Sequence, residues 1–180
     1  MTPMISGLDA PESHQRQAEL VPLEKLRTTP ITIVGVGAIG RQVATQLAVI
    51  GAERVQLIDP DVVEEVNRGS QGYRPDQLGE NKCSAMLSDA LRINPTNRWR
   101  ATYGRFTRDV AYDTVVLSCV DNMRSRSFMH NCLKDHEGYF GDVRMGPENI
   151  RVLCAYSPES WEHYRQHLYS DEEARPARCT

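Results

Sequence analysis

Short apolar runs rich in β-branched residues alternate along the chain with longer stretches whose apolar positions recur every three or four residues. The short runs predict buried strands, and the longer stretches predict amphipathic helices. Strands are predicted at 31–34, 55–59, 99–103, 114–119, 139–142 and 150–156. Helices are predicted near 20–26, over 38–50, from 83 to the Asn94-Pro95 stop and over 123–133. This alternation indicates an α/β fold with a doubly wound, mostly parallel sheet.

The connection between the second strand and the next long helix, residues 62–78, is polar and contains glycine. It is too long for an ordinary turn in a compact domain, and connections of this length are often functional. We therefore expect a functional loop here.

Three glycines follow the first strand and open the first long helix: Gly35, Gly37 and Gly40. In this context they allow a tight turn, a close backbone approach to phosphate and close helix–strand packing, which predicts a Rossmann-like nucleotide-binding half. The alternative is a close helix–strand contact without a ligand. Asp59 ends the second strand, where a carboxylate can accept hydrogen bonds from ribose hydroxyls. Without the glycine loop, Asp59 could also be a helix cap or a surface charge.

Composition excludes several classes of function. The chain has 180 residues and a net charge of −3 at pH 7, so no overall basic field attracts nucleic acid or anionic membranes. No apolar run approaches a membrane span, and the first residues lack the pattern of a secretion signal. The five cysteines are odd in number and never spaced C-x-x-C. This usage predicts a cytoplasmic protein without a disulfide framework or a zinc motif.

Four further polar residues separate an ATP site from a dinucleotide site. Asn67 and Gln71, on the long connection, can donate amide hydrogens to phosphate oxygens. Lys82 precedes the apolar stripe of its helix, from where its ammonium can reach a phosphate; a solvated lysine is the alternative. Asp121 follows the fourth strand and can hold Mg²⁺, although Asp-Asn after a strand is also a common helix cap.

The motifs G-x-G-x-x-G, D-x-D, N-x-x-x-Q, G-x-x-K and C-x-D-N occur here in that order, at fitting spacing. This series resembles the ubiquitin-activating-enzyme-like superfamily, and most closely its ThiF/MoeB/HesA type, from about residue 16 to residue 131. The resemblance implies a homodimer or pseudo-dimer. It also implies an ATP- and Mg²⁺-dependent adenylyltransferase that activates the C-terminal carboxylate of a ubiquitin-like or sulfur-carrier protein and releases pyrophosphate.

The resemblance also assigns roles to residues. The glycine loop would line the nucleotide, and Asp59 would hold the ribose. The phosphates would be addressed by Asn67, Gln71 and Lys82, and Mg²⁺ by Asp121. Arg16 would reach the ATP of a neighbouring subunit. Arg126 matches a recurrent family arginine, in contact with either ligand or dimer partner.

Two positions depart from the family or stand apart from it. Ser70 occupies the place of the family's arginine before the glutamine. Either Arg68 or Arg74 substitutes for that arginine, or catalysis is weaker. The sequence around Cys179 resembles the neighbourhood of the thioester cysteine in eukaryotic members, and the alternative is a passive thiol. Arg144 would either pair with the incoming carboxylate or serve as a turn residue.

The expected organisation has three parts. Residues 1–30 form an N-terminal arm with a short helix, and residues 31–156 form the Rossmann-like adenylation domain. Residues 157–180 form a polar segment that leads to a crossover loop, where we expect the chain to be truncated. Two rival functions stay open: a non-catalytic partner subunit of a heterodimeric activating enzyme, and an NAD-dependent oxidoreductase. The oxidoreductase would leave Lys82, Gln71 and Asp121 without a role.

Overall fold

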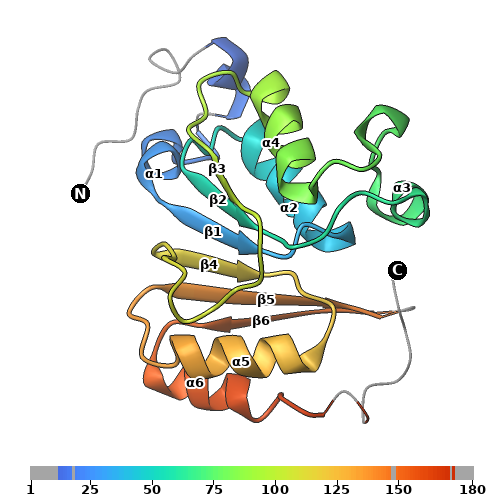
Figure 1. Cartoon of the computed structure of the whole chain (residues 1–180). Coiled ribbons are helices and arrows are strands. Elements are labelled where there is room, and N and C mark those ends of the chain that lie inside the picture. The colour runs from blue at the N-terminus through green and yellow to red at the C-terminus, as the bar shows by residue number, and fades with distance from the viewer. Residues whose placement is uncertain (1–11, 18, 147–148, 171, 173–180) are drawn as a thin grey trace.

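A six-stranded sheet organises the computed structural model, which describes residues 12–17, 19–146, 149–170 and 172 (Figure 1). The strands are β1 (Ile31–Val34), β2 (Val55–Ile58), β3 (Arg100–Thr102), β4 (Val115–Ser118), β5 (Tyr139–Met145) and β6 (Ile150–Ala155). Their spatial order is β3-β2-β1-β4-β5-β6. All neighbouring pairs are parallel except β5 and β6, which run antiparallel.

Helices cover both faces of this sheet. The helices of the described chain are α1 (Leu23–Thr28), α2 (Ala38–Val49), α3 (Glu65–Gln71), α4 (Lys82–Ile93), α5 (Met123–Leu133) and α6 (Pro158–Arg165), with 3₁₀ turns η1 (Glu12–Gln17) and η2 (Pro75–Gln77). Not all of them cover the sheet, because α3 lies beyond its edge (Figure 1). Figure 1 shows α2 and α4 on one side of the sheet and α5 and α6 on the other.

The central strand β1 shows why this arrangement forms. Ile31 and Ile33 pack into the core under α2 and α4, whereas Val34 packs into the core over α5 and α6. All four residues of β1 are buried, as expected of a parallel strand that is covered on both faces. On the second side, α6 contributes Trp161 and Tyr164 to the core.

The predicted α/β fold with a doubly wound, mostly parallel sheet is confirmed. Each predicted strand and long helix is present, with ends that differ by a few residues. The functional loop expected over 62–78 was wrong in one respect, because it contains α3 and η2. Asn67 and Gln71 therefore lie on a short helix, which ends at Gly72 in the left-handed conformation (φ 74°).

The sheet places several chain segments at one edge. Val34 pairs with Ile58 on one side and with Ser118 on the other, and Ile58 pairs with Thr102. The next residue along each strand therefore lies at the carboxyl edge, where ligands bind in sheets of this type. These four residues are Gly35, Asp59, Tyr103 and Cys119.

No helix in the part of the chain that the structure describes combines the length and the apolar character needed to cross a membrane.

Candidate functional site

The glycine loop makes a tight passage between β1 and α2. Gly35 has a φ of +90°, and a Cβ there would lie 2.8 Å from the carbonyl oxygen of Cys119. A Cβ at Gly40 would lie 1.8 Å from the carbonyl oxygen of Gly35, so only glycine allows the helix to pack this closely. Gly37 is different, because a Cβ there would meet its nearest atom, Oε1 of Gln71, only at 3.9 Å. Gly35 and Gly40 are therefore required by the fold, whereas Gly37 leaves the approach to the α2 N-terminus open.

Asp59 lies beneath this loop and is 5% exposed. One carboxylate oxygen accepts the N–H of Val36 at 2.6 Å, and the other accepts the N–H of Asp61 at 2.8 Å. Burial raises the pKa of this carboxyl above its usual value, and the two backbone N–H groups only partly offset the effect. Each oxygen keeps a further lone pair, so Asp59 can fix the loop and still accept a ribose hydroxyl.

Lys82 is a buried cation at the same edge. It is the first residue of α4 and is 5% exposed, so the solvated alternative is excluded. Its Nζ lies 3.2 Å from Oδ2 of Asp61, whose side chain is 62% exposed. An ammonium that is itself desolvated but paired with a solvated carboxylate is well suited to exchange that partner for a phosphate.

The helix α3 carries two buried amide side chains, of which Gln71 lies beside the glycine loop. Asn67 is buried, and its Oδ1 accepts the N–H of Glu64 at 3.0 Å, which caps the helix start. Gln71 is 5% exposed, and its Oε1 is buried without a hydrogen-bond partner among the described residues. This amide oxygen beside Gly37 is therefore available as an acceptor to a water or to a polar ligand.

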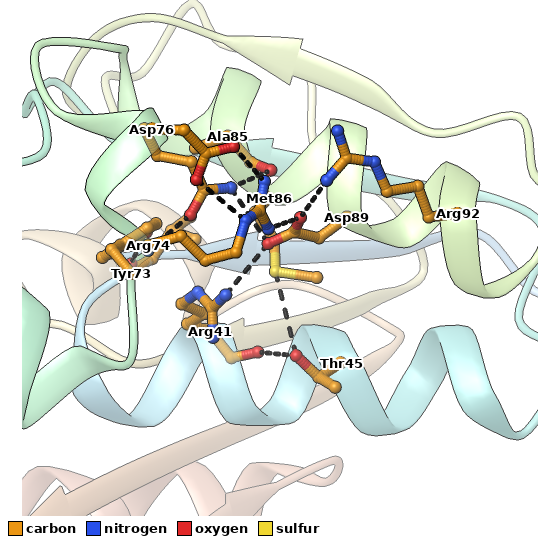
Figure 2. A network of polar contacts seen from close by, with 11 residues as sticks. Arg41, Thr45, Tyr73, Arg74, Asp76, Ala85, Met86, Asp89 and Arg92 are labelled. Carbon is orange, nitrogen blue, oxygen red and sulfur yellow. Dashed lines mark hydrogen bonds and ion pairs between the residues drawn. The ribbon is translucent and has the colours of Figure 1, made fainter.

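A polar network holds the segment after α3 against the two neighbouring helices (Figure 2). Its centre is the carboxylate of Asp89 on α4, which accepts hydrogen bonds from Arg41 at 2.9 Å, from Gln77 at 3.1 Å and from Arg74. Burial acts to raise the pKa of Asp89, but the hydrogen bonds from Arg74 and Gln77 outweigh it, and the pKa lies below its usual value.

Tyr73 connects this network to the glycine loop. Its hydroxyl donates to the carbonyl oxygen of Val36 at 2.6 Å, and the guanidinium of Arg41 lies over its ring at 4.8 Å from the centroid. Tyr73 was not among the residues predicted from sequence. Its position two residues after Gln71, beside Gly72, was the available signal.

Asp121 is exposed at the opposite end of this edge, two residues after Cys119. Its Oδ1 accepts a hydrogen bond from Nδ2 of Asn122 at 2.8 Å. The helix-cap role falls to Asn122, whose Oδ1 accepts the N–H of Ser125 at 2.8 Å at the start of α5. The carboxylate of Asp121 is therefore not used as a cap. No group of three His, Cys, Asp or Glu side chains with metal-binding geometry occurs among the described residues.

One predicted catalytic residue, Arg16, is not brought to this edge. Arg16 is exposed on η1, and a Cβ at Gly51, just beyond the C-terminal end of α2, would lie 2.9 Å from Nε2 of its neighbour His14. The glycine loop lies at the other end of α2, which is twelve residues and about 18 Å long. Arg16 therefore cannot serve the site of its own chain. Cys179 lies outside the described residues.

Two arginines left open by the sequence are both buried against one carboxylate. Arg126 donates through Nε to Asp142 at 3.0 Å, and Arg144 donates through Nε to the same side chain at 2.6 Å. Arg144 lies within β5, so the alternative of a turn residue is wrong. Its pairing with Asp142 means that an incoming carboxylate would have to displace an existing partner.

The thiols nearest the site are poor nucleophiles. Burial raises the pKa of Cys83 to about 12 and that of Cys119 to about 12. Both side chains therefore remain protonated at neutral pH and act as small core residues.

Comparison with known proteins shows the family of the chain. The model of the ThiF family matches residues 12–139 of the chain. The chain belongs to the ThiF family.

Its relatives in the ThiF family include two enzymes named ubiquitin-like modifier-activating enzyme 5. The one from Oryza sativa subsp. japonica is 29% identical over 139 residues, which cover 67% of this chain and 33% of that protein. The one from Caenorhabditis elegans is 30% identical over 128 residues, which cover 62% of this chain and 30% of that protein. The chain thus spans about a third of the length of these relatives.

Solved structures of ThiF-type fold also resemble the chain. The E. coli tRNA N6-threonylcarbamoyladenosine dehydratase TcdA gives a TM-score of 0.65 at 25% identity, covering 75% of this chain and 60% of that one. E. coli MccB, in a complex with MccA-N7isoASN, gives a TM-score of 0.73 at 17% identity, covering 80% and 47%. At that identity the likeness to MccB concerns the fold alone.

The structure describes Ser70 and the two arginines near it. Ser70 is exposed on α3, Arg68 pairs with Glu65 on the same helix, and Arg74 is bound by Asp76 and Asp89. A role for either arginine in place of the family arginine would therefore require it to exchange an acidic partner.

Sequence reasoning also missed an aromatic ring at the ligand edge. Tyr103 follows β3 directly, lies one strand away from Asp59 and is 64% exposed. Its hydroxyl accepts a hydrogen bond from Oγ of Ser84, in the first turn of α4, at 3.0 Å. The sequence alone did not indicate a role for this tyrosine, because its neighbours are determined by the order of the strands in the sheet.

Proposed function

We propose that this chain is an ATP-dependent adenylyltransferase domain that activates the C-terminal carboxylate of a ubiquitin-like or sulfur-carrier protein as an acyl-adenylate, with release of pyrophosphate. One observation carries the proposal: the glycine loop, the buried carboxylate of Asp59 and the buried ammonium of Lys82 meet at one sheet edge. Membership of the ThiF family and relatives named as activating enzymes support it.

The strand order suggests how a nucleotide would lie. Phosphates belong at the N-terminus of α2, where helix N–H groups lack helical acceptors, and the ribose belongs at Asp59 on the neighbouring strand. One strand further, the exposed ring of Tyr103 is available to the base. Mg-ATP would supply the α-phosphate that the carrier carboxylate attacks.

The chain's own residues would position and neutralise the reactants. Lys82 would leave Asp61 for a phosphate. The amide N–H groups of Asn67 and Gln71 on α3 would donate to phosphate oxygens. Asp121 would hold Mg²⁺, which usually takes one or two carboxylates together with substrate phosphates and water. Chemistry of this kind depends on positioning and charge stabilisation, and it requires no side-chain nucleophile.

The wider organisation is part of the proposal. Residues 31–156 would form the adenylation domain of a cytoplasmic homodimer, with residues 1–30 as an arm and 157–180 as a segment leading to a crossover loop. In such a dimer Arg16, which lies far from its own glycine loop, would serve the neighbouring subunit's site. Cys179 would be either the thioester nucleophile or a passive thiol.

A second candidate is a partner subunit that does not itself catalyse adenylation. One observation favours it: Ser70 replaces the family arginine, and the adjacent Arg68 and Arg74 are committed to acidic partners. An NAD-dependent oxidoreductase is a weaker rival, because it would give a buried Lys82 no role.

Thermal melting with Mg-ATP, Mg-AMP or NAD separates these functions, because a ligand that binds only the folded state raises the melting temperature. We expect a rise with Mg-ATP that is lost in Lys82→Ala. Lys134→Ala, which removes an exposed lysine at the end of α5, is the matched control and should keep the full rise. A rise with NAD alone would favour the oxidoreductase. No rise with any ligand would favour the partner subunit.

A further inference from the structure

Asp142 is the most deeply buried carboxylate beside the proposed site. Its side chain is fully buried, and it accepts hydrogen bonds from Arg126 at 3.0 Å, from Arg144 at 2.6 Å and from the hydroxyl of Tyr164 at 3.2 Å. We call these four residues the Asp142 cluster. The two guanidinium groups are also nearly sealed, with side chains 6% and 9% exposed.

Stability alone is a weak explanation for this cluster. Two buried cations share one anion, and taking three charges out of water costs more than an apolar core of the same volume. In some proteins, buried ionic groups are retained because they fix one specific geometry. The question is therefore which geometry the Asp142 cluster fixes.

Arg126 fixes the backbone that leads to Asp121. While its Nε is bound to Asp142, its Nη2 donates to the carbonyl oxygen of Val120 and, at 3.4 Å, to that of Val143. Val120 immediately precedes Asp121. Arg126 thus ties the loop after β4 to strand β5 at the ligand edge.

Asp121 depends on this backbone support because its side chain makes few contacts. It is exposed, and its carboxylate contacts only the adjacent Asn122 among the hydrogen bonds found in the described chain. Its direction is therefore set by the backbone on either side. The preceding residues are held by the N–H of Cys119, which donates to Val34 at 2.8 Å, and by Arg126 at the Val120 carbonyl.

We propose that Arg126, oriented by Asp142, is a positioning residue that aims the Asp121 carboxylate at the Mg²⁺ of the bound nucleotide. The metal role of Asp121 in this inference rests on the proposed function. The contact by which Arg126 holds the backbone before Asp121 does not depend on that function. Arg144 supplies an internal control. It uses the other oxygen of Asp142, but its Nη1 donates to the carbonyl of His167 at 2.8 Å, so it holds the segment after α6 instead.

The test compares Arg126→Lys with Arg144→Lys. Each variant keeps the positive charge, but an ammonium on a flexible stem cannot reproduce the planar fork that binds two acceptors at once. Amide hydrogen exchange of the segment 119–125, measured without nucleotide, reads the loop directly. We expect about tenfold faster exchange there in Arg126→Lys, with no change in Arg144→Lys, because only Arg126 contacts this loop.

A second measurement reads the consequence for the metal. The Mg²⁺ concentration that gives half of the ATP-induced rise in melting temperature should increase about tenfold in Arg126→Lys, as is typical when a residue that orients a metal ligand is changed. Arg144→Lys should keep the wild-type midpoint. If Arg126→Lys does not fold, Asp142→Asn, which keeps the side-chain shape but removes the charge that holds Arg126, should show the same local increase in exchange.

Equal exchange and equal Mg²⁺ midpoints in the two lysine variants would overturn the positioning role alone. Asp121→Ala tests the metal role of Asp121 separately from the positioning role of Arg126, because it should raise the Mg²⁺ midpoint at least as far as Arg126→Lys does. An unchanged midpoint in Asp121→Ala would overturn the metal role of Asp121 and the positioning proposal with it.

Discussion

Two buried carboxylates collect arginines on opposite faces of the sheet, and they differ in how well they are sealed. Asp89, on the α2–α4 side, has a side chain that is 11% exposed, and two of its partners, Arg74 and Arg92, are 36% and 64% exposed. Asp142, on the α5–α6 side, is fully buried with buried partners. Two arginines of the first network, Arg74 and Arg92, can reach water. The arginines of the second network are almost completely shielded from it.

The two networks also support different parts of the ligand edge. The Asp89 network holds Tyr73, whose hydroxyl reaches the glycine loop, and therefore serves the proposed nucleotide contacts (Figure 2). The Asp142 cluster holds the backbone before Asp121 and therefore serves the proposed metal contact. A partly exposed ionic network would thus support the proposed nucleotide contacts, and a fully buried one would support the proposed metal contact.

The largest effect is expected from Asp142→Ala. This change would leave two buried guanidinium groups without their anion, a loss that typically costs about 3–5 kcal/mol of unfolding free energy. Urea unfolding of the purified variant measures it. A cost no greater than that of Asp89→Ala would show that burial is not what distinguishes the two networks.

Asp89→Ala should be milder, at about 1–3 kcal/mol, because Arg74 and Arg92 can turn to water while Arg41 and Gln77 lose a buried acceptor. The same urea measurement applies. Arg92→Ala is the matched control, since its contact with Asp89 is long (3.7 Å) and exposed, and we expect little change there. A larger loss in Arg92→Ala than in Asp89→Ala would contradict this description of the network.

Tyr73→Phe isolates the link from the Asp89 network to the glycine loop. Removing the hydroxyl leaves the Val36 carbonyl without this donor and should cost about 1 kcal/mol. It should also weaken Mg-ATP binding in calorimetry, because the loop loses a fixed point. Tyr112→Phe, whose ring lies beside Phe106 and His136 away from the loop, should leave Mg-ATP binding unchanged. Equal affinities for Mg-ATP in all three proteins would break the link.

The smallest effect concerns pH and Asp89. Its pKa is lower in the folded chain than its ordinary value of 3.8, so the group contributes stability that is present above the unfolded pKa and lost as pH falls through the folded pKa. The difference in unfolding free energy between wild type and Asp89→Asn should therefore be constant near neutral pH and shrink below about pH 4. A difference that grows on acidification would have the wrong sign.

The sequence was a good guide wherever a residue's role is local. The β-branched run at Ile31–Val34 specifies a strand buried on both faces, and the spacing of Gly35 and Gly40 follows from contacts with adjacent backbone. The helix α3 was missed because Val66 is exposed and Gly69 interrupts it, so it has no apolar stripe to read.

Roles that depend on distant partners could not be predicted. Arg126 and Arg144 have a role only because β5 carries Asp142 into register with Ser118 at the end of β4. Tyr103 lies beside Asp59 because β3 pairs with β2 at the sheet edge. Both neighbour relations follow from the order of the strands in the sheet, and local sequence does not specify that order.

The most direct test of the account is calorimetric titration of ATP, with and without Mg²⁺, into the wild type, Asp59→Ala and Asp121→Ala. We predict that Asp59→Ala weakens ATP binding under both conditions, because the ribose contact does not involve the metal. Asp121→Ala should bind ATP like the wild type without Mg²⁺ but lose the gain that Mg²⁺ provides. Absence of ATP binding by the wild type, or the same Mg²⁺ gain in wild type and Asp121→Ala, would contradict the division of this edge into nucleotide and metal halves.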